Sequence, residues 1–384
     1  MSEPIADFSL LGGPLHRFGV RFGLVRRGTN CAPMGALFGV LPWFVLSVMA
    51  ALEGRGEALF SLEAVSVHVR LLVAIPLFFL CEAGLDPRVT TFVREIVDAG
   101  LVSDRELPEL QRQIEHSSRR KDGWQTDAGC FAVAIASELF GPKLALTSMM
   151  PSLHQNPALW TWSGEWYWLV CIPLFRFLLL RLLCRLWLWC SFLWRLSRLD
   201  LRLLPAHPDR TGGLGYLEVV QVYYWPLLLA ISAVQSASLA QEVASGVRAI
   251  KLPVQEIGVM LGTEALLVLG PLVLFTPRLW ACRTQGLSDY AAFASKYVRA
   301  FDDKWLRPQL SGSGEPLLGT PDLQSLADLA GSIDVVRSMR WAPIGPRLLV
   351  GVACVALMPV LPLVLFKYPL AELVTAFVRQ LSGL

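Results

Sequence analysis

Long apolar stretches recur along the sequence, each close to the roughly 20 residues that an α-helix needs to cross the hydrocarbon core of a bilayer. Charged residues make up only 17% of the chain, against about 25% in soluble domains. The clearest stretches are Pro33–Leu52, Ala64–Leu85, Trp166–Leu193, Tyr216–Ala240, Glu256–Thr276 and Arg347–Phe366. A weaker one, Asp127–Met150, is interrupted by Glu138, Gly141, Pro142 and Lys143. The sequence therefore predicts an all-α polytopic membrane helix bundle of six or seven spans, with cytoplasmic amphipathic helices.

Positive charge is distributed unevenly between the loops, and lysine and arginine favour the cytoplasmic side of a membrane. The segment before the first span carries Arg17, Arg21, Arg26 and Arg27, whereas "PSLHQNPALWTWSGE", before the fourth, has none. This asymmetry predicts a cytoplasmic N-terminus and, with seven spans, an external C-terminus. If the last apolar stretch is a hairpin broken at Pro359 and Pro362, the number of spans is six.

This orientation divides the chain into membrane and cytoplasmic parts. We expect a cytoplasmic N-terminal segment (1–32), two spans (33–85), a cytoplasmic helical loop (86–123), four spans (124–276), a cytoplasmic helical region (277–346), and a last span with a C-terminal amphipathic segment (347–384). In the first of the long loops, Ser103 and Glu106 fit a capping box, which predicts a polar helix running to about Arg120.

The second long cytoplasmic region carries aromatic residues at steps of three and four, which is typical of one face of a helix. These residues are Tyr290, Phe293, Tyr297, Phe301 and Trp305. We expect the sixth span to continue as this helix. After a Pro/Gly/Ser-rich linker, Thr320 and Pro321 predict a second helix with its own apolar stripe. Both stripes must be buried, either against helices of the same chain or at an interface with a partner.

Ionisable side chains inside membrane spans are costly and by default suggest function. The candidates for a transport pathway are His68, Arg70, Glu82, Glu138, Arg176, Arg181, Arg185 and Glu264. In the functional interpretation, Arg176 near the bilayer centre attracts an anion, and His68 is a titratable gate. In the structural interpretation, a carboxylate at matching depth neutralises each arginine. The pairs are then Arg70 with Glu138, Arg176 with Glu264, and Arg181 or Arg185 with Glu82.

The motif "HPDRTGGLG" connects the fourth and fifth spans. Its candidate site residues are His207, Asp209, Arg210, Gly212, Gly213 and Gly215. Glycines that open a helix can present free amides to an anion, so a phosphate or an anionic lipid headgroup is one candidate ligand. The motif lacks the spacing of dinucleotide-binding and P-loop sequences. The alternatives are a tight structural turn and, less well supported, a general base formed by His207 and Asp209.

The eight cysteines form no CxxC pair, and most lie inside apolar stretches, so we interpret them as packing residues rather than metal ligands. We expect no metal and no cofactor. The expected partners are the lipid bilayer, an anionic lipid and a second copy of this chain, and we expect no nucleic acid.

Four segments together resemble a family of bacterial multi-pass inner-membrane proteins that carry an HPDRxGGLG loop. They are "HVRLLVAIPLFFLCE" (His68–Glu82), "SRLDLRLLPAHPDRTGGLGYL" (Ser197–Leu217), "YVRAFDDKW" (Tyr297–Trp305) and "LLGTPDLQSLADLAGSIDVVRSMR" (Leu317–Arg340). The resemblance covers most of the chain. It implies a bacterial inner-membrane location and a helical fold, and it implies no activity.

Three functional hypotheses follow from the residues. The first is an inner-membrane transport protein, channel-like or a carrier, that passes a small anion or polar solute near Arg176. The second is a non-transporting scaffold, sensor or accessory subunit whose aromatic helix docks a cytoplasmic partner. The third is a lipid-acting membrane enzyme centred on His207 and Asp209.

Overall fold

The computed structural model describes residues 8–25, 31–140, 161–244, 254–306 and 321–362. These residues form helices and no strand, apart from one isolated antiparallel bridge between Val102 and Leu201. The all-helical fold predicted from the sequence is therefore confirmed.

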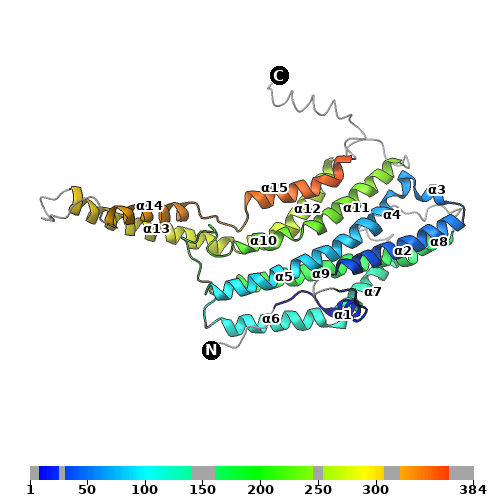
Figure 1. The fold of residues 1–384 in the computed structure, drawn as a ribbon, viewed down its shortest axis with the longest axis horizontal. Helices are drawn as coiled ribbons and strands as arrows, with labels where there is room; N and C mark the ends of the chain where they lie inside the picture. The colour runs from blue at the N-terminus through cyan, green and yellow to red at the C-terminus, as the bar shows by residue number, and fades with distance from the viewer. Residues whose placement is uncertain (1–7, 26–30, 141–160, 245–253, 307–320, 363–384) are drawn as a thin grey trace, which may run out of the picture.

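Long helices form an elongated bundle, and two further helices extend beyond one end of it (Figure 1). The bundle contains α2 (Ala32–Leu52), α5 (Ile75–Asp98), α7 (Trp124–Phe140), α9 (Ile172–Leu196), α11 (Trp225–Ala244), α12 (Val254–Val273) and α15 (Pro346–Leu357). Helices α13 (Thr276–Phe301) and α14 (Pro321–Arg337) pack together as the projecting pair. We call this pair the arm, and the end of the bundle that carries it the arm end.

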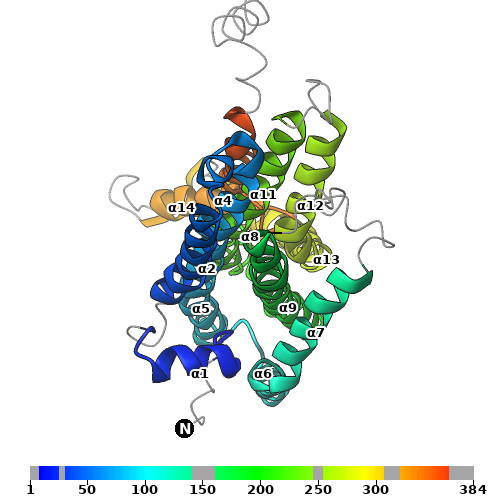
Figure 2. The same ribbon diagram turned by 90° about the vertical axis from the view of Figure 1, so that its right-hand side faces the viewer.

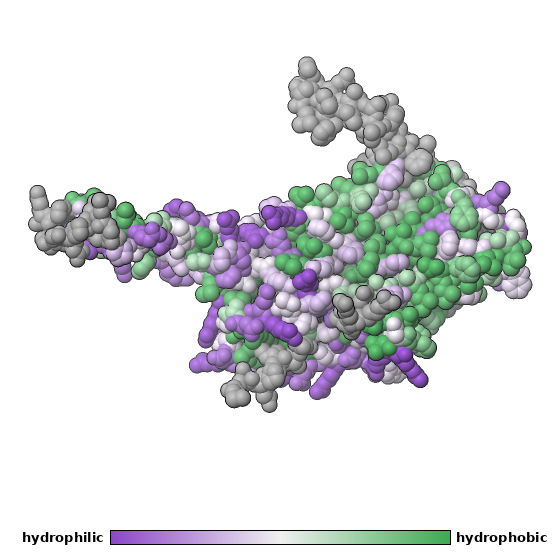
Figure 3. Space-filling model, viewed as in Figure 1, coloured by the Kyte–Doolittle hydropathy of each residue, from purple (hydrophilic) through white to green (hydrophobic). Residues whose placement is uncertain are grey.

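Four described helices are long and apolar enough to cross a membrane, namely Ala32–Leu52, Val65–Asp98, Tyr216–Ala244 and Gln255–Val273. They coincide with four predicted spans and indicate a membrane location. Figure 3 shows apolar residues over the part of the bundle away from the arm, and polar residues over the arm. The remaining predicted spans are the arginine-bearing helix Trp162–Leu196 and two stretches that are described only in part. Six or seven spans are therefore not confirmed.

Shorter helical segments connect and extend the long helices. They are α1 (Gly13–Arg21), α3 (Gly56–Leu59), η1 (Leu62–Ala64), α4 (Val65–His68), η2 (Val69–Ala74), α6 (Leu107–Asp122), α8 (Trp162–Trp166), η7 (Tyr167–Cys171), α10 (Tyr216–Val222), η8 (Asp302–Leu306) and η10 (Met358–Val360). Helix α1 lies across the bundle axis (Figure 2), and Phe18 on the helix and Phe22 directly after it are exposed. This orientation suits an amphipathic helix at a membrane surface.

Two of the long helices contain a π-helical turn directly before the same four residues, Ile-Pro-Leu-Phe. The turn η2 precedes Pro76, and η7 precedes Pro173. A proline removes one amide and clashes with the carbonyl four residues earlier, and in both helices that carbonyl lies in the widened turn. The sequence signal for this shared device is the repeated IPLF, which hydropathy alone does not distinguish from the surrounding apolar residues.

Two predicted helix boundaries are wrong in detail. Helix α6 starts at Leu107 without a side-chain cap, and it is the backbone carbonyl of Ser103, not the hydroxyl, that accepts from Glu106 N. The sixth span does not continue unbroken into α13, because two residues separate α12 from α13 at Pro277, near the start of the new helix. A proline is tolerated in the first turn, where its missing amide has no helical partner.

Candidate functional site: a projecting arm seated beside the HPDRTGGLG loop

A buried charge cluster lies between α5, α7 and α9. The guanidinium of Arg181 donates to Glu82 at 3.0 Å, and that of Arg185 lies 2.8 Å from the other carboxylate oxygen. Asp127 lies 3.6 Å from Arg181 Nε. The predicted pairing of Arg181 or Arg185 with Glu82 is confirmed for both arginines. The two positive and two negative groups balance one another, so this cluster holds the helices together rather than presenting charge to a solute.

The N-terminal strap, residues Phe8–Gly12, closes this cluster. Phe8 is buried and stacks on Phe192 with ring centroids 4.5 Å apart. The amides of Leu10 and Leu11 donate to the Asp86 carboxylate at 2.6 and 2.9 Å, and Gly12 O accepts from Arg185. These contacts connect the start of the chain to α5 and α9.

Of the two other predicted ion pairs, that of Arg176 with Glu264 is wrong, and that of Arg70 with Glu138 involves a side chain outside the described residues. Arg70 is 3% exposed and donates to the hydroxyls of Tyr167 (2.7 Å) and Ser238 (3.2 Å), with no carboxylate partner among the described residues. The side chain of Glu138, its expected partner, lies outside the described part of the chain. Glu264 is buried and accepts from Ser232 at 2.7 Å, and it makes no described contact with Arg176.

Arg176 donates to the hydroxyl of Ser137 in α7 at 3.0 Å. Its contacts therefore connect α9 with α7, whereas Glu264 connects α12 with α11. The two residues, predicted to lie at matching depth, contact different neighbours. Depth can be counted from the sequence, but the rotation of each helix about its own axis follows from packing.

His68 is held on both ring nitrogens. Its Nδ1 accepts from Trp43 Nε1 at 2.9 Å, and Nε2 lies 2.8 Å from the carbonyl of Leu59. Its ring also stacks on Phe60. These contacts hold the ring between α2 and the α3 region.

The HPDRTGGLG loop is organised around one carboxylate. Asp209 accepts hydrogen bonds from the amides of Thr211, Gly213 and Gly215 at 2.8 to 3.2 Å, and it lies 2.8 Å from His207 Nδ1. Burial alone would raise the pKa of this carboxyl, but the hydrogen bonds from Thr211, Gly215 and His207 outweigh that effect and lower it. The loop therefore already binds an anion, which is its own aspartate.

This arrangement changes the interpretation of the loop residues. Arg210 and the first two glycines, Gly212 and Gly213, adopt positive φ angles of 57°, 66° and 100°, so the chain reverses tightly around Asp209. The amides that were candidates for an external phosphate are used inside the loop. Asp209 is also engaged too fully to act as a base with His207. The geometry favours the structural turn.

The loop in turn seats the arm on the bundle. Gly286 of α13 packs against Pro205 so closely that an added Cβ would lie 2.4 Å from the proline Cβ. Just after the C-terminal end of α14, at the bundle, the guanidinium of Arg340 donates to Glu218 at 2.8 Å and to Asp209 O at 3.3 Å, and its amide donates to Arg210 O at 2.7 Å. The base of the arm is thus anchored at Pro205, two residues before the motif, and at the motif itself through Arg340.

Beyond this base the arm has no buried residue in its described part. Going outward from the bundle, the outermost buried positions are Gly286 on α13 and Val336 on α14. Four of the predicted stripe residues, namely Tyr290, Tyr297, Phe301 and Trp305, are half-buried between the helices, and Phe293 is 58% exposed. Leu306 and Leu323 are also exposed. Packing within the chain therefore covers the aromatic stripe only in part.

Asp322 holds the outer part of the arm together. Its carboxylate accepts from Lys304 Nζ at 2.9 Å and from Trp305 Nε1 at 3.1 Å, and its carbonyl accepts from the Tyr297 hydroxyl. The hydrogen bonds from Lys304 and Trp305 lower the pKa of Asp322. The arm thus has a defined shape although it lacks a core.

No protein-family model, curated protein or solved structure matches this chain. The described residues also contain no group of three or more His, Cys, Asp or Glu side chains arranged to hold a metal ion. The arm and its seat are therefore interpreted from their own geometry.

Proposed function

We propose that this protein is a membrane-anchored scaffold or accessory subunit whose arm docks a cytoplasmic protein. The single observation that carries this proposal is the absence of any buried residue on the described arm between Gly286 and Val336, despite five aromatic residues on α13 and η8. A helix pair gains stability mainly by burying an apolar face. A partner helix laid along Phe293 and Leu323 would supply the missing contacts.

The proposal includes a bacterial inner-membrane location with a cytoplasmic N-terminus and membership of the HPDRxGGLG family. Support comes from the uneven distribution of positive charge between the loops. The arm, which projects beyond one end of the bundle (Figure 1), is formed by the predicted cytoplasmic region 277–346. The seat at the HPDRTGGLG loop fixes the direction in which the arm projects, as a docking element needs.

Site-specific photo-crosslinking in cells tests the docking proposal. A benzophenone amino acid replaces Phe293 or Leu323, and the matched control replaces Gln324, which is exposed and bonded to Asp328. We expect one discrete adduct with another protein from positions 293 and 323, and none from 324. No adduct at 293 and 323 would contradict docking, and an adduct of two copies of this chain would replace it with self-assembly.

Transport of a small anion is the second candidate, and one observation favours it. Arg70 is a buried cation without a carboxylate partner in the described chain, and its Nε makes no hydrogen bond. A small anion beside it would neutralise its charge. Anion flux into liposomes should then fall in Arg70→Gln and Arg176→Leu variants that still fold, whereas a Lys296→Gln control on the arm should be unaffected. A wild-type protein without flux would reject this candidate.

A further inference from the structure

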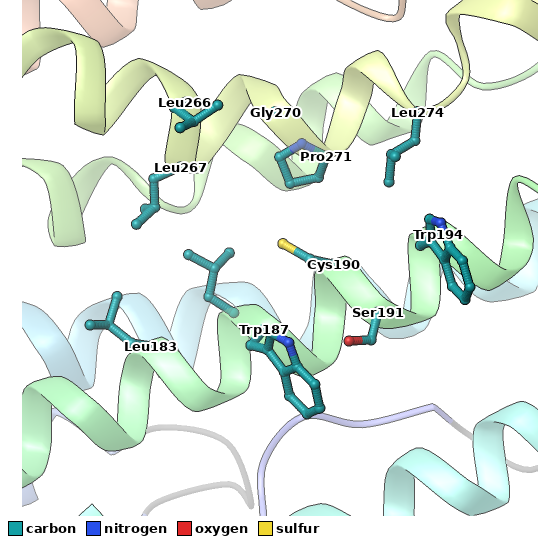
Figure 4. A pocket seen from close by; sticks show the side chains of 11 residues that line it. Leu183, Trp187, Cys190, Ser191, Trp194, Leu266, Leu267, Gly270, Pro271 and Leu274 are labelled. Atoms are coloured by element: carbon teal, nitrogen blue, oxygen red, sulfur yellow. The ribbon is translucent and has the colours of Figure 1, made fainter. Parts of the chain in front are cut away.

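An apolar groove of about 600 Å³ lies between α9 and α12 (Figure 4). Helix α9 contributes one wall and α12 the other, and Ser191 is the only residue of the lining with a polar side chain apart from the tryptophan indoles. The lining residues are Leu183, Leu186, Trp187, Cys190, Ser191, Trp194, Leu266, Leu267, Gly270, Pro271 and Leu274. The volume is in the range of about 300–1,000 Å³ that ligand sites usually have.

The groove runs along the helices for about the depth of one leaflet. Its residues on α9 recur at steps of three and four from Leu183 to Trp194, so they share one face of the helix. At a rise of about 1.5 Å per residue, that face is roughly 16 Å long, close to half of a hydrocarbon core of about 30 Å. A single acyl chain from one leaflet would match this length.

Basic side chains stand at one end of the groove. The guanidinium of Arg198, one turn beyond Trp194, lies over the Trp194 ring at 4.5 Å from its centroid. Arg278, one turn beyond Leu274, donates to the carbonyl of Arg198 at 3.3 Å. Its nearest carboxylate, Asp200, is 83% exposed and 3.9 Å away, so this ion pair is weak. The apolar groove therefore ends in two guanidinium groups on the arm side.

We propose that this groove binds an anionic phospholipid, with one acyl chain between α9 and α12 and the phosphate between Arg198 and Arg278. Basic pockets between membrane helices on the cytoplasmic side are suited to anionic headgroups, and the leaflet supplies such lipids at high local concentration. The proposal rests on the membrane location and is independent of the docking function. It assigns the lipid to the groove and not to the HPDRTGGLG loop, whose amides are engaged.

Two variants and their matched controls separate the acyl chain from the headgroup. Gly270→Leu fills the groove, because a Cβ at Gly270 meets only the tip of Leu266, at 3.5 Å. Gly262→Leu makes the same change on the same helix at a site with nothing within 4 Å, outside the groove. The double variant Arg198→Gln/Arg278→Gln removes the headgroup charges, and Lys296→Gln/Arg299→Gln removes two charges from the arm.

Native mass spectrometry measures the lipid that stays bound after the full-length protein is reconstituted in vesicles of equal parts phosphatidylcholine and phosphatidylglycerol. Wild type and both controls should retain one phosphatidylglycerol per chain. We expect these proteins to bind phosphatidylglycerol roughly thirtyfold more tightly than phosphatidylcholine, which corresponds to about 1 kcal/mol for each of the two arginines. Arg198→Gln/Arg278→Gln should remove the preference, and Gly270→Leu should remove the bound lipid.

Retention of phosphatidylglycerol by both variants at wild-type levels would overturn the proposal. The proposal would also be overturned if the wild type and the other variants showed the mass of a dimer and Gly270→Leu showed only a monomer. A second copy of the chain would then occupy the groove. Crosslinking from position 293 tests docking on the arm independently of the groove. Lipid binding and docking can therefore be rejected separately.

Discussion

The carboxylate of Glu82 faces two guanidinium groups inside the bundle, and this makes it the most sensitive position of the charge cluster. Glu82→Gln would leave Arg181 and Arg185 facing Asp127 alone. Removing one partner of a buried ion pair costs about 3–5 kcal/mol of unfolding free energy. Denaturant titration of the detergent-solubilised protein measures this loss. The control is Glu115→Gln on α6, whose pair with Arg119 is exposed and contributes less than about 1 kcal/mol. Equal effects of the two variants would show that the cluster is not structural.

The carboxylate of Asp209 is expected to stabilise the protein only in its ionised form. Its folded pKa is lowered, so this stabilisation is present above its unfolded pKa of about 3.9 and is lost as the pH falls through the folded value. At pH 7, Asp209→Asn should lower the unfolding free energy by about 2 kcal/mol. The difference from wild type should narrow below pH 4 in thermal unfolding curves. Asp104→Asn, at an exposed position before α6, should change neither the unfolding free energy at pH 7 nor its dependence on pH.

At the scale of elements, the seat of the arm depends on the absence of a side chain at Gly286. Gly286→Ala would push α13 away from Pro205, at a cost of about 1–3 kcal/mol. Gly331→Ala, made in open space on α14, should instead stabilise the arm by up to about 1 kcal/mol through helix propensity. Hydrogen exchange of amides in α13 and α14 measures both changes. Faster exchange in both variants, or in neither, would contradict the close contact at Pro205.

The helices could be predicted from the sequence because apolar stretches and aromatic spacing are local signals. The aromatic spacing predicts the stripe on α13, and Thr320 with Pro321 predicts the start of α14. The hydrogen-bond partners of Arg70, Arg176 and Glu264 have no such local signal, because helix rotation depends on contacts between distant segments. The role of Asp209 has a local signal, the Asp-x-Thr pattern of an Asx turn, which is separate from the glycine pattern of a phosphate site.

For the whole molecule, the orientation in the membrane can be tested with a membrane-impermeant maleimide. The background replaces the exposed Cys354 with serine, and single cysteines are introduced at Glu57 or Asp104, exposed positions in loops on opposite sides of the predicted layout. Intact cells should be labelled at position 57 alone, and permeabilised cells at both. Labelling of position 104 in intact cells would invert the proposed orientation and place the arm outside.

The strap also sets an order of events during biosynthesis. Phe8 is synthesised before the rings that it contacts, Trp189 and Phe192, which belong to a helix much further along the chain. At about 5–20 residues per second, the nascent chain waits on the order of ten to forty seconds before this contact can form. The strap therefore reaches its final position only after α9 has been made, and until then it does not cover Glu82 and the two arginines.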